Sequence, residues 1–215
     1  MTINDYSTVS NVKMLMPDVT WGTSYDAIMT RLITRASRLV DGLLHREPGA
    51  FSVGTQTTRY FDGSGEKELL IGELAAVPSV VSVAETGKTD NANDTGGSYT
   101  SWSVNDYYPW PSNRVKEGKP FLRLDIDQLN GSKSVWYKYP KSVKITGYFG
   151  FATTSHMPEE IAGVVEIQTV RWFKRGQQAF QDVGAVADLS QLRYVSKLDP
   201  DIASVLMEGK FTWLP

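Results

Sequence analysis

Residues 143–175 read VKITGYFGFATTSHMPEEIAGVVEIQTVRWFKR, and the hydrophobic period changes inside this stretch. Apolar and polar residues alternate over 143–147, which predicts a half-buried strand. Two glycines and three aromatic residues at 147–151 then predict a flexible, aromatic corner. Pro158 suits the first position of a helix, because its missing N–H would have no partner there. We therefore expect a strand, a corner and a long helix over 158–175.

The predicted helix 158–175 is apolar on almost every side. A helix of this kind is buried in a large core or shared with another subunit. A chain of 215 residues can hardly surround it, so we expect a subunit interface here. The residues expected at that interface are Ile161, Val164, Ile167, Val170, Trp172 and Phe173.

Two more helices are predicted near the start of the chain. Residues 5–17 favour a short helix that ends at Pro17. The span 24–44 favours a long helix, with Thr23 and Asp26 as a capping box. The residues that recur at helical spacing and are expected on its buried face are Tyr25, Ile28, Met29, Leu32, Ala36, Leu39, Val40 and Leu43.

The other face of the helix 24–44 carries Arg31, Arg35 and Arg38. These arginines either face DNA or an acidic partner, or form an ordinary solvated face. Three arginines carry little weight, and the solvated face is the preferred interpretation.

Residues 55–150 change to a period of two and predict an antiparallel β-rich block between the helices. Turn-forming residues at 62–65 and 86–98 separate its strands, and Asn130-Gly131 predicts a hairpin. The strands are expected near 57–61, 68–71, 80–83, 121–124, 135–139 and 143–149, with an irregular or edge strand in 102–111.

Residues 176–215 predict an extended C-terminal arm that ends in a short helix near 199–208. The first part has no sustained apolar face, whereas Asp199 and Pro200 are typical of a helix start. A helix this short is marginal in water, so its apolar edge should dock on another surface. The predicted fold class is therefore α+β: a body over 1–175 that contains the β-rich block over 55–150, followed by the arm.

The composition excludes several classes of site. A net charge of −2 argues against a dedicated nucleic-acid binder, and the absence of cysteine excludes disulfides and thiolate chemistry. No apolar run approaches the ~20 residues of a membrane span, and we expect synthesis in the cytoplasm. The two histidines, His45 and His156, have no acid or second ligand at a suitable spacing.

No motif for catalysis or cofactor binding is recognisable, and we expect no enzyme activity, metal or cofactor. Asp125 and Asp127 begin a pattern similar to a calcium loop, but Trp136 stands where the bidentate glutamate belongs. Glycines near Lys67 lack the spacing of a phosphate-binding loop. An unrecognised acidic site built from Glu66, Glu68 and Asp125 remains a competing hypothesis.

The β-rich block also contains a cluster of aromatic residues. These side chains either cover the core of the block or form an exposed surface on which sugar rings or bases stack. We prefer the core, because neither basic nor polar residues surround the cluster. The residues are Trp102, Tyr107, Tyr108, Trp110, Trp136 and Tyr137.

The order of these elements resembles the head–tail connector (adaptor) proteins of tailed bacteriophages and related gene-transfer particles. The resemblance rests on YFDGSG at 60–65, VPSVVSV at 77–83, VKITGYFGF at 143–151 with MPEEI at 157–161, and LDPDIASVL at 198–206. It covers most of the chain, although the β-rich block and the linker before Asp199 are longer than the family pattern.

The resemblance implies a structural virion protein at the head–tail junction. Such proteins form a homo-oligomeric ring, usually dodecameric, beneath the portal protein and extend the DNA channel toward a tail-side connector or tail protein. It implies transient, non-specific contact with DNA, no membrane partner and no catalytic residue. The main alternative is a virion or surface module whose β-rich block binds carbohydrate. The arm residues expected to contact the portal are Ile202, Val205, Leu206, Phe211 and Trp213.

Overall fold

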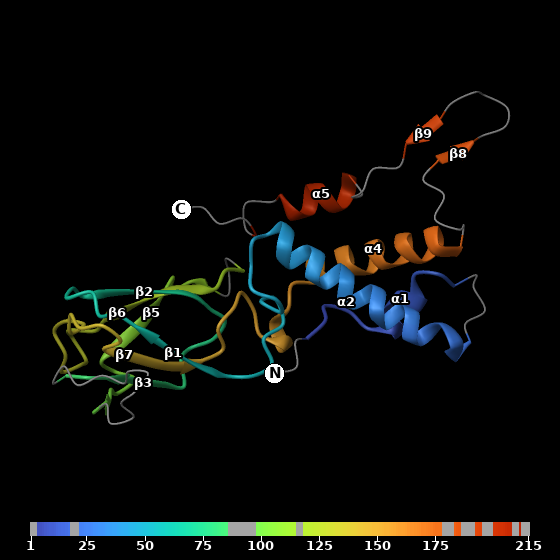
Figure 1. The fold of residues 1–215 in the computed structure, drawn as a ribbon. Helices are drawn as coiled ribbons and strands as arrows, with labels where there is room; N and C mark the ends of the chain where they lie inside the picture. Colours follow the sequence, from blue (N-terminus) through green and yellow to red (C-terminus); the bar gives the residue numbers. More distant parts are fainter. Residues whose placement is uncertain are drawn as a thin grey trace. The chain divides into compact units, whose positions relative to one another are not determined.

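The computed structural model describes residues 4–17, 22–85, 98–114, 118–177, 183–185, 192–194, 200–207 and 211. It contains both helices and antiparallel sheets, which confirms the predicted α+β class (Figure 1). The chain divides into a helical unit, formed by 1–49 and 157–215, and a β unit formed by 50–156.

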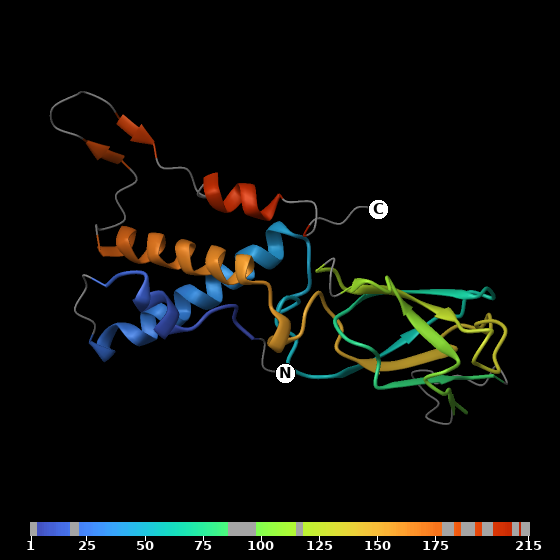
Figure 2. The ribbon, with the colours of Figure 1, turned by 180° about the vertical axis from the view of Figure 1, so that it is seen from behind.

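The helical unit is built around two long helices, α2 (Asp26–Leu43) and α4 (Glu159–Gln177). They lie side by side in both views (Figure 1, Figure 2), although more than a hundred residues separate them in the sequence. The short helices α1 (Val9–Met14) and α5 (Pro200–Leu206) pack against α4, and α1 also contacts α2.

The start of α2 differs from the predicted capping box. Thr23–Tyr25 form a 3-10 turn, η1, and no side chain caps the first turn of α2. Asp26 instead forms an ion pair with Lys13 of α1. The Asp26 carboxylate, which was expected to complete the capping box, therefore links α2 to α1.

The buried face of α2 matches the predicted face in part, because Met29, Ala36 and Val40 were expected there and Ile33 was not. Met29, Ile33, Ala36 and Val40 are buried. Ile28, which was expected in the core, is 50% exposed. Three predicted core residues of this region are exposed and leave apolar surface on α2: Tyr25, Ile28 and Leu43.

The segment after α4 contains a hairpin that the sequence pattern did not predict. Strands β8 (Val183–Ala185) and β9 (Leu192–Tyr194) pair antiparallel. The helix that follows, α5, occupies the predicted position near 199–208.

The β unit consists of two sheets that enclose one core. A four-stranded sheet has the order β1-β7-β3-β4, and a three-stranded sheet has the order β2-β6-β5. The apolar cluster between them takes side chains from both sheets. The strands are β1 (Thr57–Phe61), β2 (Glu68–Leu74), β3 (Val80–Val83), β4 (Thr100–Ser101), β5 (Tyr107–Trp110), β6 (Phe121–Ile126) and β7 (Val143–Gly147).

The predicted hairpin at Asn130-Gly131 and the strand 135–139 are wrong. The chain leaves the sheet after β6, and Trp136 enters the core, where it is completely buried. Its backbone N–H donates to Glu66 O at 2.9 Å and its indole N–H to Lys67 O at 3.1 Å. Burying one large indole therefore outweighed the strand pairing that the local pattern favoured.

The aromatic corner after β7 is present and requires a glycine. Gly150 has φ of +150°, and a Cβ there would collide with Val53 and Ala50. This close approach allows Phe151 to pack against Phe51, with 5.0 Å between the ring centroids. The short 3-10 turn η2 (Thr154–His156) then leads toward α4.

Candidate assembly surface of the helical unit

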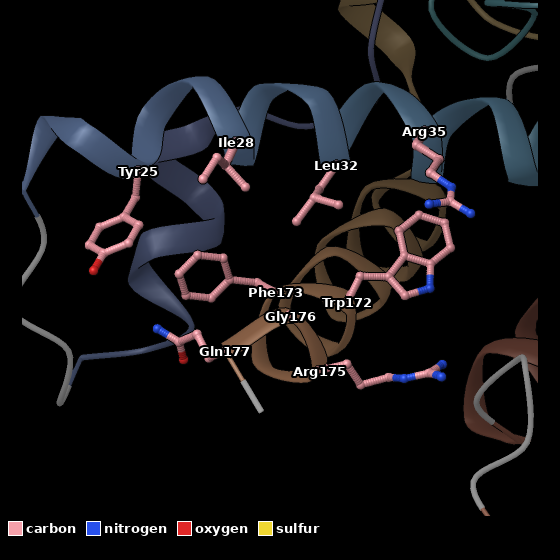
Figure 3. Close-up of a pocket in the computed structure, with 9 residues that line it drawn as sticks. All are labelled: Tyr25, Ile28, Leu32, Arg35, Trp172, Phe173, Arg175, Gly176 and Gln177. Carbon is pink, nitrogen blue, oxygen red and sulfur yellow. The ribbon is translucent and has the colours of Figure 1, made fainter. Parts of the chain in front are cut away.

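An apolar groove lies between the N-terminal half of α2 and the C-terminal end of α4 (Figure 3). Its volume is about 570 Å³. The floor is aromatic: Phe173 is buried, and its ring meets Tyr25 edge-on with 5.7 Å between the centroids. The lining residues are Tyr25, Ile28, Leu32, Arg35, Trp172, Phe173, Arg175, Gly176 and Gln177.

The groove has a basic end. Figure 3 shows Arg35 and Arg175 on either side of Trp172, whereas Tyr25 and Gln177 lie at the other end. The guanidinium carbon of Arg35 lies 4.8 Å from the centre of the Trp172 ring. No acidic residue is among the residues that line this groove. The groove is therefore suited to apolar side chains that are accompanied by a negative charge.

The predicted interface residues of α4 fall into two groups. Ile161, Val164 and Phe173 are buried within the helical unit. Val170 and Trp172 are half-buried, and Ile167 is 46% exposed. The first group therefore stabilises the chain's own fold, and the second remains accessible to another molecule.

The predicted DNA-facing arginines of α2 have different surroundings. Arg31 and Arg35 are exposed, but Arg35 stacks on Trp172. Arg38 donates to Asn4 O at 3.0 Å and pairs with Asp41. The three arginines therefore do not form a uniform basic stripe.

Asp41 is the centre of a buried polar network at the end of α2. Its carboxylate accepts hydrogen bonds from the Tyr6 hydroxyl and from the Gly49 N–H, and Arg38 Nε lies 3.1 Å away. Burial raises the pKa of Asp41 above its usual value, although these hydrogen bonds and Arg38 oppose the shift. The network fixes the N-terminal segment to α2 and occupies Arg38.

The apolar edge of α5 was expected to dock on a partner, but in the structure most of it packs against its own chain. Ile202, Leu206 and Phe211 are buried in the helical unit, and Arg46 donates to Phe211 O at 2.7 Å. Val205 is half-buried, and Trp213 lies outside the described residues. Packing against the same chain therefore already satisfies most of this edge.

The aromatic cluster of the β unit is mostly core. Trp102 and Trp136 stack with 4.8 Å between ring centroids, and Tyr107 is buried beside them. Tyr108 and Trp110 are exposed on β5, but Arg123 covers the Trp110 ring at 4.6 Å. The core interpretation therefore accounts for the three buried members.

Strand pairing brings together two of the acidic residues considered for catalysis. Glu68 and Asp125 are opposite each other on β2 and β6, and Arg123 forms ion pairs with both. Burial raises the pKa of Asp125, whereas Arg123 lowers it. Arg123 pairs with both carboxylates, so the arrangement is typical of a surface ion-pair cluster.

The described part of the chain offers neither a metal-binding cluster nor a membrane-spanning helix. It has no group of three or more histidine, aspartate or glutamate side chains that could hold a metal ion. It also has no helix with the length and hydropathy of a membrane span. His156 accepts from or donates to the Thr153 hydroxyl at 3.0 Å.

The fold is similar to that of chains in solved particle necks. No family model and no curated protein matches the sequence. A chain in the neck of an empty gene transfer agent (GTA) particle, computed with C6 symmetry, matches at 11% identity and a TM-score of 0.55. A chain in the neck of the native particle, computed with C12 symmetry, matches at 10% identity and a TM-score of 0.53. Both matches cover 100% of this chain and 97% of the other. At these identities the comparisons establish a shared fold.

Proposed function

We propose that this chain is a structural virion protein of a phage-like particle: a head–tail adaptor that forms a ring beneath the portal. One observation carries the proposal, namely that the whole fold matches chains from particle necks over nearly their full length. Those necks were computed with C6 and C12 symmetry, which supports a ring of identical copies. The resemblance of the sequence motifs to head–tail connectors agrees with this function.

The helical unit offers the surfaces that a ring needs. Closed rings use two different patches on each copy, so that each subunit contacts the next in the same way. The exposed part of α4 around Ile167 and the apolar groove are two such patches. We assign no subunit contact to the β unit.

The proposed channel holds DNA weakly. The chain has a net charge of −2, and Arg38 is already occupied by Asp41. Few phosphate contacts release few counterions, so affinity should be low and sensitive to salt. Replacing Arg31 and Arg35 with serine should change DNA binding at physiological salt by less than about tenfold in an electrophoretic assay. Nanomolar binding that these substitutions abolish would instead indicate a dedicated DNA-binding role.

The arm is proposed to contact the portal, and the opposite side of the ring to contact a tail-side connector or tail protein. Since Ile202 and Leu206 are buried in their own unit, the portal contact should use Val205 and the residues near Trp213. Portal binding would then add to a helix that is already folded, rather than order it.

Electron microscopy tests the proposal directly. Cryo-electron microscopy of particles that contain this chain should show it as a ring at the head–tail junction. Purified protein mixed with portal should sediment as a complex. A chain found elsewhere in the particle, or a chain that remains monomeric at every concentration and with the portal present, would refute the function.

A further inference from the structure

One line of residues on α4 remains accessible on the side opposite its buried face. Glu160, Gly163, Ile167 and Val170 follow one another at spacings of three or four residues, which places them along one side of the helix. Glu160 and Ile167 are exposed, and Gly163 and Val170 are half-buried. We call these four residues the α4 stripe.

Gly163 is not explained by packing within the chain. A Cβ at this position would meet no atom within 4 Å, and no positive φ demands a glycine. A glycine inside a helix destabilises it relative to alanine. The glycine at 163 therefore lowers helix stability although a larger side chain would fit in the free chain. Such a position is suited to the close approach of another backbone.

We propose that the α4 stripe of one copy packs into the α2–α4 groove of the next copy. The inference rests on the proposed ring and specifies its contact. The apolar side chains of Ile167 and Val170 enter the groove beside Ile28 and Tyr25. Gly163 lets the helix approach closely enough for them to reach the aromatic floor at Phe173.

The charges and spacings of the two surfaces match. On the stripe, Glu160 precedes Ile167 by two helical turns, about 10.5 Å. On the groove, Ile28 and Arg35 are also two turns apart. Placing Ile167 against Ile28 therefore brings Glu160 to the basic end of the groove. An ion pair there fixes the direction in which the stripe lies in the otherwise apolar contact.

The contact is head-to-tail, as a ring requires. The groove side of α4 carries Trp172, which lies on another side of the helix from Glu160, Gly163 and Ile167 of the stripe. Each copy can therefore offer its stripe to one neighbour and its groove to the other. A contact of this type closes into a ring when the rotation between copies is a simple fraction of a turn.

Engineered cysteines test the pairing, because the chain has no cysteine of its own. In assembled rings of the double variant Ile28→Cys/Ile167→Cys, oxidation should give a ladder of covalent oligomers. Each single variant should give no ladder, since the two sites differ. The matched control is Ile28→Cys/Met207→Cys, because Met207 is 77% exposed and lies off the stripe.

A pair of glycine variants tests the close approach. Gly163→Ala should raise the melting temperature of the monomer but weaken ring assembly by roughly tenfold or more, because the added methyl overpacks the contact. The matched control is Gly42→Ala in α2, where a Cβ also meets open space. Gly42→Ala should raise the melting temperature and leave assembly unchanged.

The outcomes separate this inference from the proposed function. Rings that form normally but give no ladder, or that give the same ladder in the control pair, would overturn the stripe-and-groove contact and leave the ring intact. Gly163→Ala assembling as tightly as Gly42→Ala would overturn the close approach. A wild-type chain that forms no ring under any condition would overturn the proposed function itself.

Discussion

Replacing Ile167 with aspartate should abolish assembly and leave the monomer folded. The side chain is 46% exposed in the single chain, so an aspartate there can reach water. Substitutions at such positions usually change the free energy of unfolding by about 1 kcal/mol or less. In the proposed ring the same side chain is enclosed by the groove of the next copy, and a carboxylate there loses its water.

The magnitude follows from how much of the side chain remains to be buried. Complete burial of an isoleucine stabilises by about 1.5–3 kcal/mol, and the free chain already buries roughly half of it. Losing the other half therefore costs about 1 kcal/mol per contact. Burying an aspartate against apolar side chains adds a few kcal/mol. A total of about 2–4 kcal/mol weakens each contact by roughly 30- to 1,000-fold.

The assay is mass photometry or sedimentation velocity over a range of concentrations, with circular dichroism to monitor folding. The control is Ile161→Asp, on the same helix and with a completely buried side chain. This control should lose the folded helical unit, because it places an unpaired charge in the core. If Ile167→Asp is folded and still forms rings at wild-type concentrations, α4 is not at the protomer contact.

Other predictions concern the single chain. Trp136→Ala should destabilise the β unit by about 3–5 kcal/mol in urea unfolding followed by fluorescence, because the indole is completely buried; an unchanged midpoint would contradict its place in the core. Ile202→Ala should cost about 2–5 kcal/mol and accelerate amide exchange over α5, whereas an α5 that is ordered only by a partner would exchange fast in the wild type as well. The raised pKa of Asp41 means that the folded chain binds this proton more readily than the unfolded chain. Its contribution to stability is therefore fully present below the unfolded pKa near 3.8 and is lost as pH rises through the raised value, and Asp41→Asn should remove that part of the pH dependence measured by urea unfolding.

Hydrophobic periodicity predicted where the long helices lie but not in every case which of their residues are buried. The long helices were expected at 24–44 and 158–175 and lie at Asp26–Leu43 and Glu159–Gln177. The period cannot decide which neighbouring residue points inward, because Ile28 and Met29 are both apolar and adjacent on the helix. Only the packing of α4 against α2 buried Met29 and left Ile28 in the groove.

The strands show a similar limit. Most were predicted from alternation, including the edge strand β5 with its proline. Their pairing was not, because a turn such as Asp62–Gly65 can join strands within one sheet or pass between two. In the structure β1 pairs with β7, and β2 pairs with β6 in the other sheet.

The α+β class, the positions of the long helices and the lack of cysteine chemistry could be read from the sequence, because period and composition are local properties. The tertiary structure alone decided which apolar residues remain available to a partner. It assigned Ile161, Val164 and Phe173 of the predicted interface to the chain's own core and left Ile167 exposed. It also created the groove, whose walls come from helices that are distant in sequence. The physical reason is that burial is a property of pairs of surfaces, and a single segment of sequence carries only one of them.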